Sequence, residues 1–130
     1  QAFKGHQDAV YSAIFSSDES HVLTASDDCT AKLWDADRGH CVLTFSGHSG
    51  CVWSAVFTQD ESHVLTASDD STAKMWDART GLCSCSFNGH ASDVNSAVCS
   101  PDGSTVLTAS DDFSVKLWCA DTGNNLRTFR

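Results

Sequence analysis

The sequence predicts an all-β protein made of three similar four-stranded antiparallel sheets. The chain repeats its own pattern at a fixed spacing, and such self-similarity determines an architecture before any local assignment is made. Each repeat holds short segments of β-branched, aromatic and small residues between polar turns, a pattern typical of strands. No segment shows the sustained 3.6-residue apolar spacing of a helix.

The spacing is 42 residues along the whole chain. Gly-His occurs at residues 5–6, 47–48 and 89–90, so the histidines lie 48 − 6 = 42 and 90 − 48 = 42 residues apart. A tryptophan recurs at positions 34, 76 and 118 with the same spacing. We therefore divide the chain into a short leading segment, residues 1–4, and three repeats, residues 5–46, 47–88 and 89–130.

Four strands are expected in each repeat. In the first repeat they are residues 10–16, 21–26, 30–35 and 41–45. The turns between them are rich in Asp, Ser and Gly, which favour turns. In the second strand Val22, Leu23 and Ala25 lack strict polar alternation, which indicates a sheet covered on both faces. The repeats are therefore predicted to stack on one another.

This pattern resembles the WD-repeat β-propeller family over almost the whole chain, in three copies. The resemblance implies that each repeat is one blade of a propeller. Propellers close with about 4–8 blades, so three blades would form a partial ring with two uncovered sheet faces. We expect further blades either from a longer parent chain or from homo-oligomerisation into six or nine blades. Residues 1–4 align with the end of a preceding strand, and the chain lacks an initiator Met, which favours the longer chain.

The resemblance also implies a hydrogen-bonded set of His, Thr, Asp and Trp inside each repeat. Such a set can satisfy all its members in a dry site, because indole donates, carboxylate accepts, and hydroxyl and imidazole do both. The predicted sets, called tetrads below, are His6, Thr24, Asp28 and Trp34; His48, Thr66, Asp70 and Trp76; and His90, Thr108, Asp112 and Trp118. These residue types also match a catalytic triad, but three copies at one spacing favour a structural role. Cys119 departs from the family pattern, in which Asp usually follows the tryptophan.

Partners of this family commonly bind the face that carries the Gly-His segments, near the central channel. The positions that the resemblance places there are Ala9, Tyr11 and Asp27; Cys51, Trp53 and Asp69; and Asp93, Asn95 and Asp111. Tyr and Trp are enriched among interface anchors, and one Asp per repeat would make the rim acidic. We predict a site for a protein or peptide with a basic side chain, to which Trp53 adds a cation–π contact. The alternative is that the Asp residues only form type I turns.

A second motif is Trp76-Asp77-Ala78-Arg79. It resembles the Trp-Asp-x-Arg element by which some WD-repeat substrate receptors dock on adaptors of cullin-RING ubiquitin ligases. The flanking aliphatic positions are Ala73 and Ala78, smaller than in the fuller pattern. This is the alternative function to a general scaffold, and such short motifs arise by chance.

Charge and composition narrow the function classes. The net charge is −9, from 8 basic and 17 acidic side chains, and no basic patch for nucleic acid is visible. No apolar run approaches the roughly 18 residues that span a bilayer. No titratable cluster beyond the tetrads indicates an active site, a cofactor or a metal. We expect a non-enzymatic protein-interaction scaffold; an enzyme that uses the propeller channel is the competing hypothesis.

The chain has seven cysteines, an odd number that argues against a complete internal disulfide framework. Cys41 and Cys83 occupy the same repeat position and are expected to be buried apolar groups. The spacing of Cys83 and Cys85 is not that of a zinc site. Free thiols indicate a reducing compartment, so we expect the protein inside the cell, in the cytoplasm or nucleus.

Overall fold

The computed structural model describes residues 1–130, which form twelve strands and no helix. No helix is therefore present that could cross a membrane. The strands of blade 1 are β1 (Val10–Phe15), β2 (His21–Ser26), β3 (Thr30–Asp35) and β4 (Cys41–Ser46). Those of blade 2 are β5 (Val52–Phe57), β6 (His63–Ser68), β7 (Thr72–Asp77) and β8 (Cys83–Asn88). Those of blade 3 are β9 (Val94–Cys99), β10 (Thr105–Ser110), β11 (Val115–Cys119) and β12 (Asn125–Phe129).

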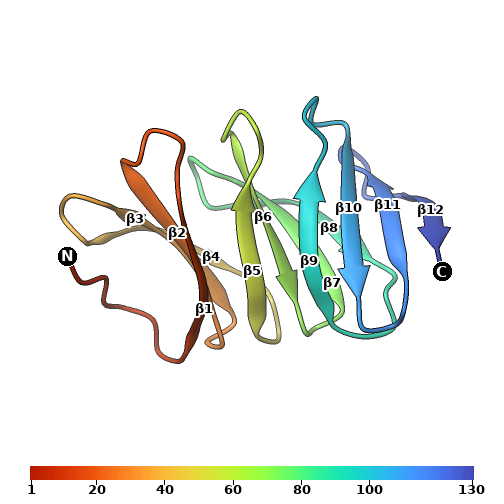
Figure 1. Ribbon diagram of the computed structural model, residues 1–130, viewed down its shortest axis with the longest axis horizontal. Coiled ribbons are helices and arrows are strands. Elements are labelled where there is room, and N and C mark those ends of the chain that lie inside the picture. The colour runs from red at the N-terminus through yellow and green to blue at the C-terminus, as the bar shows by residue number, and fades with distance from the viewer.

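Each blade is a four-stranded sheet in which consecutive strands pair antiparallel. The three blades stand side by side along the molecule, with the two chain ends at opposite ends of the stack (Figure 1). The predicted fold class is confirmed: the protein is all-β, and its three sheets form propeller blades that do not close into a ring.

The apolar core lies between the blades, in two separate clusters. Between blades 1 and 2 it is built from Leu23, Ala25, Ala31, Leu33, Phe45, Val52, Ala55, Val64 and Trp76. Between blades 2 and 3 it is built from Leu65, Ala67, Ala73, Met75, Phe87, Val94, Ala97, Val106, Trp118 and Ala120. We call these two contacts junction 1–2 and junction 2–3. Blade 2 is covered on both faces, which explains the lack of polar alternation in its second strand.

The outer faces of blades 1 and 3 expose residue types that the junctions bury. Val10 is 49% exposed, whereas Val52 and Val94 at the same repeat position are 0% exposed. Leu107 is 40% exposed on blade 3, whereas the equivalent Leu65 is 0% exposed. The two outer faces therefore have the chemistry of unfilled junctions.

Phe3 in the leading segment lies on Trp34, with ring centroids 5.9 Å apart. Phe45 lies on Trp76 at the same 5.9 Å, and Phe87 lies on Trp118 at 5.8 Å. In each case a phenylalanine two residues before the Gly-His segment of a blade covers the tetrad tryptophan of that blade. The leading segment thus partly covers the outer face of blade 1.

One expectation about the cysteines is wrong. Cys41 and Cys83 were predicted to be buried, but both are exposed. They begin β4 and β8, the last strands of blades 1 and 2, which pair on one side only. A β-bulge at Val42 in β4, and at Ser84 in β8, interrupts the side-chain alternation of these edge strands. The two cysteines therefore lie in solvent, although Phe45 and Phe87 in the same strands are buried.

Candidate functional site

The four members of each tetrad lie together inside their blade. In blade 2, His48 Nδ1 is 2.8 Å from Asp70 Oδ2, and His48 Nε2 is 2.7 Å from Thr66 Oγ1. Trp76 Nε1 donates to the same threonine oxygen at 2.9 Å. Because a carboxylate only accepts, Nδ1 carries the imidazole proton, and the threonine hydroxyl donates to Nε2. Hydrogen bonds are thus donated from Trp to Thr, from Thr to His and from His to Asp, so every member of the tetrad has a partner.

Blades 1 and 3 repeat this geometry. The His–Asp distances are 2.7 Å for His6 and 2.8 Å for His90, and both His–Thr distances are 2.7 Å. Trp34 and Trp118 each donate to their threonine at 2.8 Å. The tetrads thus join the loop before each first strand to the second and third strands of the same blade.

The tetrad carboxylates also close the turn between the second and third strands. Asp70 accepts the N–H of Thr72 at 2.9 Å and its hydroxyl at 2.6 Å. Burial acts to raise the pKa of Asp70, but the hydrogen bonds from Thr72 and His48 outweigh it, so the pKa is lowered. Burial lowers the pKa of His48 despite the neighbouring Asp70. The resting pair is therefore a neutral imidazole beside a carboxylate.

This arrangement has the connections of a catalytic triad but not its accessibility. Thr66 is 0% exposed and Thr108 is 1% exposed. Their hydroxyl oxygens are already occupied by an indole N–H and an imidazole. A nucleophile must reach substrate, and these hydroxyls cannot. The geometry fits a structural tie in every blade.

The predicted partner-binding positions share a backbone feature that the sequence did not reveal. In β1 the ladder pairs Val10 with Ser26 and Ser12 with Ala25, so Tyr11 is the extra residue of a β-bulge. The same shift makes Trp53 the bulged residue of β5 and Asn95 that of β9. Bulges re-aim a side chain out of the regular strand alternation. The first strand of every blade therefore presents one bulged side chain.

At junction 1–2 two of these bulged residues touch. The ring centroids of Tyr11 and Trp53 are 4.9 Å apart, and their planes are inclined by 41°. Tyr11 is 44% exposed, whereas Trp53 is half-buried. The structure thus brings together one aromatic from each of two blades, with the tyrosine ring on the outside.

Two carboxylates and a thiol adjoin this aromatic pair. Cys51 Sγ donates to Asp27 Oδ1, which joins the start of blade 2 to the turn of blade 1. The hydrogen bond to Asp27, burial and the neighbouring Asp69 raise the pKa of Cys51 to about 12, so the thiol keeps its proton. Burial and the charge of Asp27 raise the pKa of Tyr11. We call Tyr11, Asp27, Cys51, Trp53 and Asp69 the rim site.

Gly50 fixes where Asp69 lies. A Cβ added to Gly50 would stand 1.7 Å from Asp69 Oδ1, closer than any two such atoms can approach. The equivalent residues of the other repeats are Asp8 and Ser92, which have side chains. Glycine at this one position therefore lets Asp69 lean over the loop toward Cys51, and the sequence analysis missed it.

The equivalent end of junction 2–3 is arranged differently. Asn95 Nδ2 donates to Asp111 Oδ1 at 2.7 Å, so this pair is internally satisfied. Asp111 N–H also donates to the carbonyl of Asp93 at 2.9 Å. Asp93 is half-buried, and Ala9 is exposed at the outer side of blade 1. The three residues Asp93, Asn95 and Asp111 lie together in blade 3 but join no aromatic.

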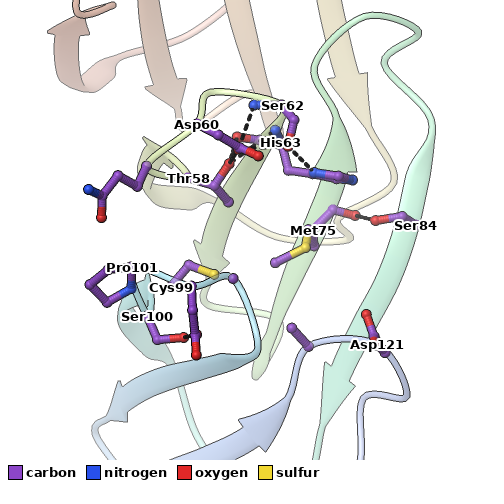
Figure 2. A pocket seen from close by; sticks show the side chains of 14 residues that line it. Thr58, Asp60, Ser62, His63, Met75, Ser84, Cys99, Ser100, Pro101 and Asp121 are labelled. Carbon is purple, nitrogen blue, oxygen red and sulfur yellow. Dashed lines mark hydrogen bonds between the residues drawn. The ribbon is translucent and has the colours of Figure 1, made fainter.

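Grooves lie at the opposite end of both junctions. The groove of junction 2–3 has a volume of about 330 Å³ and lies between the turns that begin at Thr58 and Ser100. Figure 2 shows Asp60 bonded to Thr58 and Ser62 on one wall, with Cys99 and Pro101 on the other. The groove of junction 1–2 is larger, about 550 Å³, and is lined by Leu33, Leu43, Phe57 and Arg79 among others. Arg79 of the second motif thus lies in an inter-blade groove.

A contact at this end distinguishes the two junctions. Glu61 Oε2 and Oε1 accept the N–H and hydroxyl of Ser17 at 2.8 and 2.9 Å. At junction 2–3 the equivalent residues are Gly103 and Gln59. Only junction 1–2 therefore has this side-chain link.

Comparison with known proteins agrees with the blade geometry. The profile of the WD domain, G-beta repeat, matches residues 1–35, 39–77 and 81–119. The chain belongs to the WD40 family. This confirms the resemblance inferred from the Gly-His and Trp spacing. Each matched segment ends just after the tetrad tryptophan of one blade.

Individual WD40 proteins match one repeat length of the chain. The probable E3 ubiquitin ligase complex SCF subunit sconB of Talaromyces stipitatus is 50% identical over 42 residues, 32% of this chain and 6% of that protein. THO complex subunit 6 of Arabidopsis thaliana is 45% identical over 40 residues, 31% of this chain and 11% of that protein. The serine-threonine kinase receptor-associated protein of Dictyostelium discoideum is 50% identical over 42 residues, which are 32% of this chain and 14% of that protein. The matched region spans a small part of each of these relatives.

Proposed function

We propose that this WD40 chain is a non-enzymatic scaffold that binds a protein or peptide at the rim site, through a basic side chain of the partner. The observation that carries the proposal is the contact of Tyr11 with Trp53 beside Asp27 and Cys51. Aromatic residues at the centre of a rigid surface are the usual anchors of interfaces. Fixed blades supply that rigidity without an ordering cost on binding.

Charge favours a basic partner. The only basic side chains within salt-bridge distance of a carboxylate are the three tetrad histidines, so no Lys or Arg neutralises Asp27 or Asp69. The chain as a whole carries −9, which would steer a basic partner toward it. The exposed Tyr11 ring offers a face for cation–π contact. Asp93, Asn95 and Asp111 would extend the same acidic rim onto blade 3.

The test is Trp53→Ala, with binding of arginine- and lysine-containing peptides measured by calorimetry. Loss of the aromatic contact is expected to weaken binding about 2- to 30-fold, which corresponds to ~0.5–2 kcal/mol. Phe15→Ala is the matched control, because this aromatic side chain is 61% exposed and ends β1 at the opposite end from the Gly-His segment. Unchanged affinity in Trp53→Ala would remove the rim site as the binding surface.

We infer that the chain does not catalyse a reaction. The His–Asp–hydroxyl sets occur three times, and the hydroxyls of Thr66 and Thr108 are closed to substrate, which supports a structural use. We propose no cofactor and no metal for this chain. Turnover of a substrate that disappears with a single substitution would contradict it.

A second candidate function is docking on an adaptor of a cullin-RING ubiquitin ligase through residues 76–79. Arg79 is exposed, pairs with no carboxylate, and lines the 550 Å³ groove beside Leu43 and Phe57. One relative is named as a subunit of an SCF ubiquitin ligase complex. Pull-down with such an adaptor, compared between the parent chain and Arg79→Ala, decides between this role and the first.

We propose that further blades cover the outer faces, supplied by a longer chain or by a second copy. Val10 and Leu107 are exposed where their equivalents are fully buried, which supports this. Light scattering on the 130-residue polypeptide would report its assembly: a mass of 13.9 kDa at all concentrations would exclude the second copy.

We also place the protein inside the cell, in the cytoplasm or nucleus. Its seven cysteines are free, as in reducing compartments. The named relatives include subunits of a ubiquitin ligase complex and of the THO complex. Imaging of a tagged protein tests this, and secretion would contradict it.

A further inference from the structure

The four tryptophans differ in one respect. Trp34, Trp76 and Trp118 each donate their indole N–H to a threonine. The Nε1 of Trp53 is buried and has no hydrogen-bond partner. A buried donor without an acceptor is costly. The only other buried side-chain polar atom without a partner is the hydroxyl of Ser12, next to Tyr11 in β1, so the unpaired indole N–H requires an explanation.

The same place holds two carboxylates that lack a counter-charge. Asp27 and Asp69 lie on either side of Cys51, whose single S–H proton cannot neutralise both. Asp69 reaches this position only because residue 50 is glycine. The rim site therefore offers two acceptors for a cation, one exposed aromatic ring and one unpaired donor.

A ligand that complements all of these has two parts. It needs a flat cation with several N–H donors, which can bridge two carboxylates and lie on an aromatic ring. It also needs a carbonyl oxygen close to that cation, to accept the indole N–H. Guanidinium has a fixed fork of five donors, whereas ammonium is a compact point charge. Arginine within a peptide chain carries both the guanidinium and the adjacent backbone carbonyl.

We propose that the rim site recognises an arginine residue within a peptide in preference to lysine, with Gly50 and the indole N–H of Trp53 as the determinants of that preference. This inference rests on the proposed function of the rim site. The guanidinium bridges Asp27 and Asp69 across junction 1–2. A peptide carbonyl accepts the Trp53 N–H. The Tyr11 ring is 44% exposed and packs on that indole, so access to the buried N–H requires this ring to turn aside.

The experiment compares two short acetylated and amidated peptides that differ only in Arg or Lys at the central position. Calorimetry on the parent chain is expected to give about tenfold tighter binding of the Arg peptide, because charge-assisted bidentate contacts are the stronger ones. In ¹H–¹⁵N spectra only one of the four indole signals, that of Trp53, is expected to move downfield on binding.

Two variants isolate the determinants. Gly50→Ala displaces Asp69 and is expected to reduce the preference for Arg to about twofold or less. Ser92→Ala is its matched control at the same position of blade 3 and is expected to keep the preference. Trp53→Phe keeps a ring but no N–H, and is expected to weaken the Arg peptide about fivefold. Asp69→Asn replaces Gly50→Ala if that variant does not fold, with the same expected loss of preference.

The outcomes separate this inference from the function on which it rests. Equal binding of the Arg and Lys peptides, with both weakened by Trp53→Ala, would overturn the arginine preference and leave the scaffold function standing. Full Arg preference in both Gly50→Ala and Trp53→Phe would overturn the assigned determinants. No binding of either peptide to the parent chain would overturn the inference and the basic-peptide function together.

Discussion

Junctions 1–2 and 2–3 share most of their interior residue types and differ at their ends. Both bury a Leu, two Ala and a Phe of one blade against two Val, an Ala and a Trp of the next. At the Gly-His end, however, the bulged residues Tyr11 and Trp53 meet at the first junction. At the second junction the bulged residue of blade 3 is Asn95, which donates a hydrogen bond to Asp111 of its own blade. At the other end the Glu61–Ser17 link occurs only in the first. The repeats thus maintain the stack through their shared residues, and the positions that vary between repeats provide the chemistry for binding.

The strongest test of the shared interior replaces the same leucine in both junctions. Leu23→Ala and Leu65→Ala each remove a side chain that is 0% exposed, so each is expected to lower the unfolding free energy by about 2–5 kcal/mol. Leu107→Ala, 40% exposed at the same position of blade 3, should cost clearly less. Urea denaturation of the three variants measures this, and a large difference between the first two would break the equivalence of the junctions.

The tetrads should be equivalent as well. Asp70→Ala leaves His48 and the N–H and hydroxyl of Thr72 without their acceptor, and is expected to destabilise by about 2–4 kcal/mol. Asp112→Ala should do the same in blade 3. Asp69→Ala, one residue away, is the control and should change stability little. Equal melting temperatures for Asp70→Ala and the parent would contradict the structural role.

Stability should fall in acid in two steps. The pKa of His48 is lowered in the folded protein, so its contribution is complete above the ordinary value of about 6.5 and is lost as pH falls below it. The pKa values of Asp28, Asp70 and Asp112 are also lowered, through hydrogen bonds that outweigh burial. Their contribution is complete above about pH 4 and is lost as pH falls further.

Melting temperatures between pH 7.5 and pH 3 measure both steps. Asp70→Asn should reduce the lower step, because asparagine does not titrate. A melting temperature that rises as pH falls from 7 to 4 would reverse the expected sign.

The smallest expected effect concerns the link that only junction 1–2 has. Glu61 has φ = 59°, a left-handed conformation that side chains disfavour, and Gly103 has φ = 76° at the same position. Glu61→Ala loses the Ser17 contacts and keeps the strain, and should cost about 0.5–1.5 kcal/mol. Glu61→Gly loses the contacts but relieves the strain, so its net change should be close to zero. Thermal unfolding compares them; a larger loss in Glu61→Gly than in Glu61→Ala would contradict this account.

The repeat arithmetic predicted the fold almost completely from the sequence. Gly-His and Trp at 42-residue spacing located every strand within one residue in blade 1, for example 41–45 expected and Cys41–Ser46 found. The tetrads could be assigned by position because their residue types recur three times. Such regularity tells which residues are alike in each blade, so it predicts what the blades have in common.

Features that depend on three-dimensional placement were harder to predict. The bulges at Tyr11 and Trp53 depend on pairing register, which residue types do not encode. The fit of Asp69 over Gly50 depends on the distance between two loops of one blade. The exposure of Cys41 depends on its place in an edge strand, and its apolar character alone indicated burial. A residue-by-residue comparison of the repeats would have singled out Gly50, because Asp8 and Ser92 replace it elsewhere.

The phenylalanine that covers each tetrad tryptophan has a consequence for engineering the chain. Phe45 belongs to the last strand of one blade but completes the packing around the indole of the next. A repeat cut out at the Gly-His boundary would therefore lack the phenylalanine that covers its own tryptophan, and would contain the phenylalanine that covers the tryptophan of the next blade. To graft or duplicate one unit with its contacts intact, the cut should fall before Cys41, where β4 begins, so that each transferred piece brings the aromatic cover for its own tryptophan.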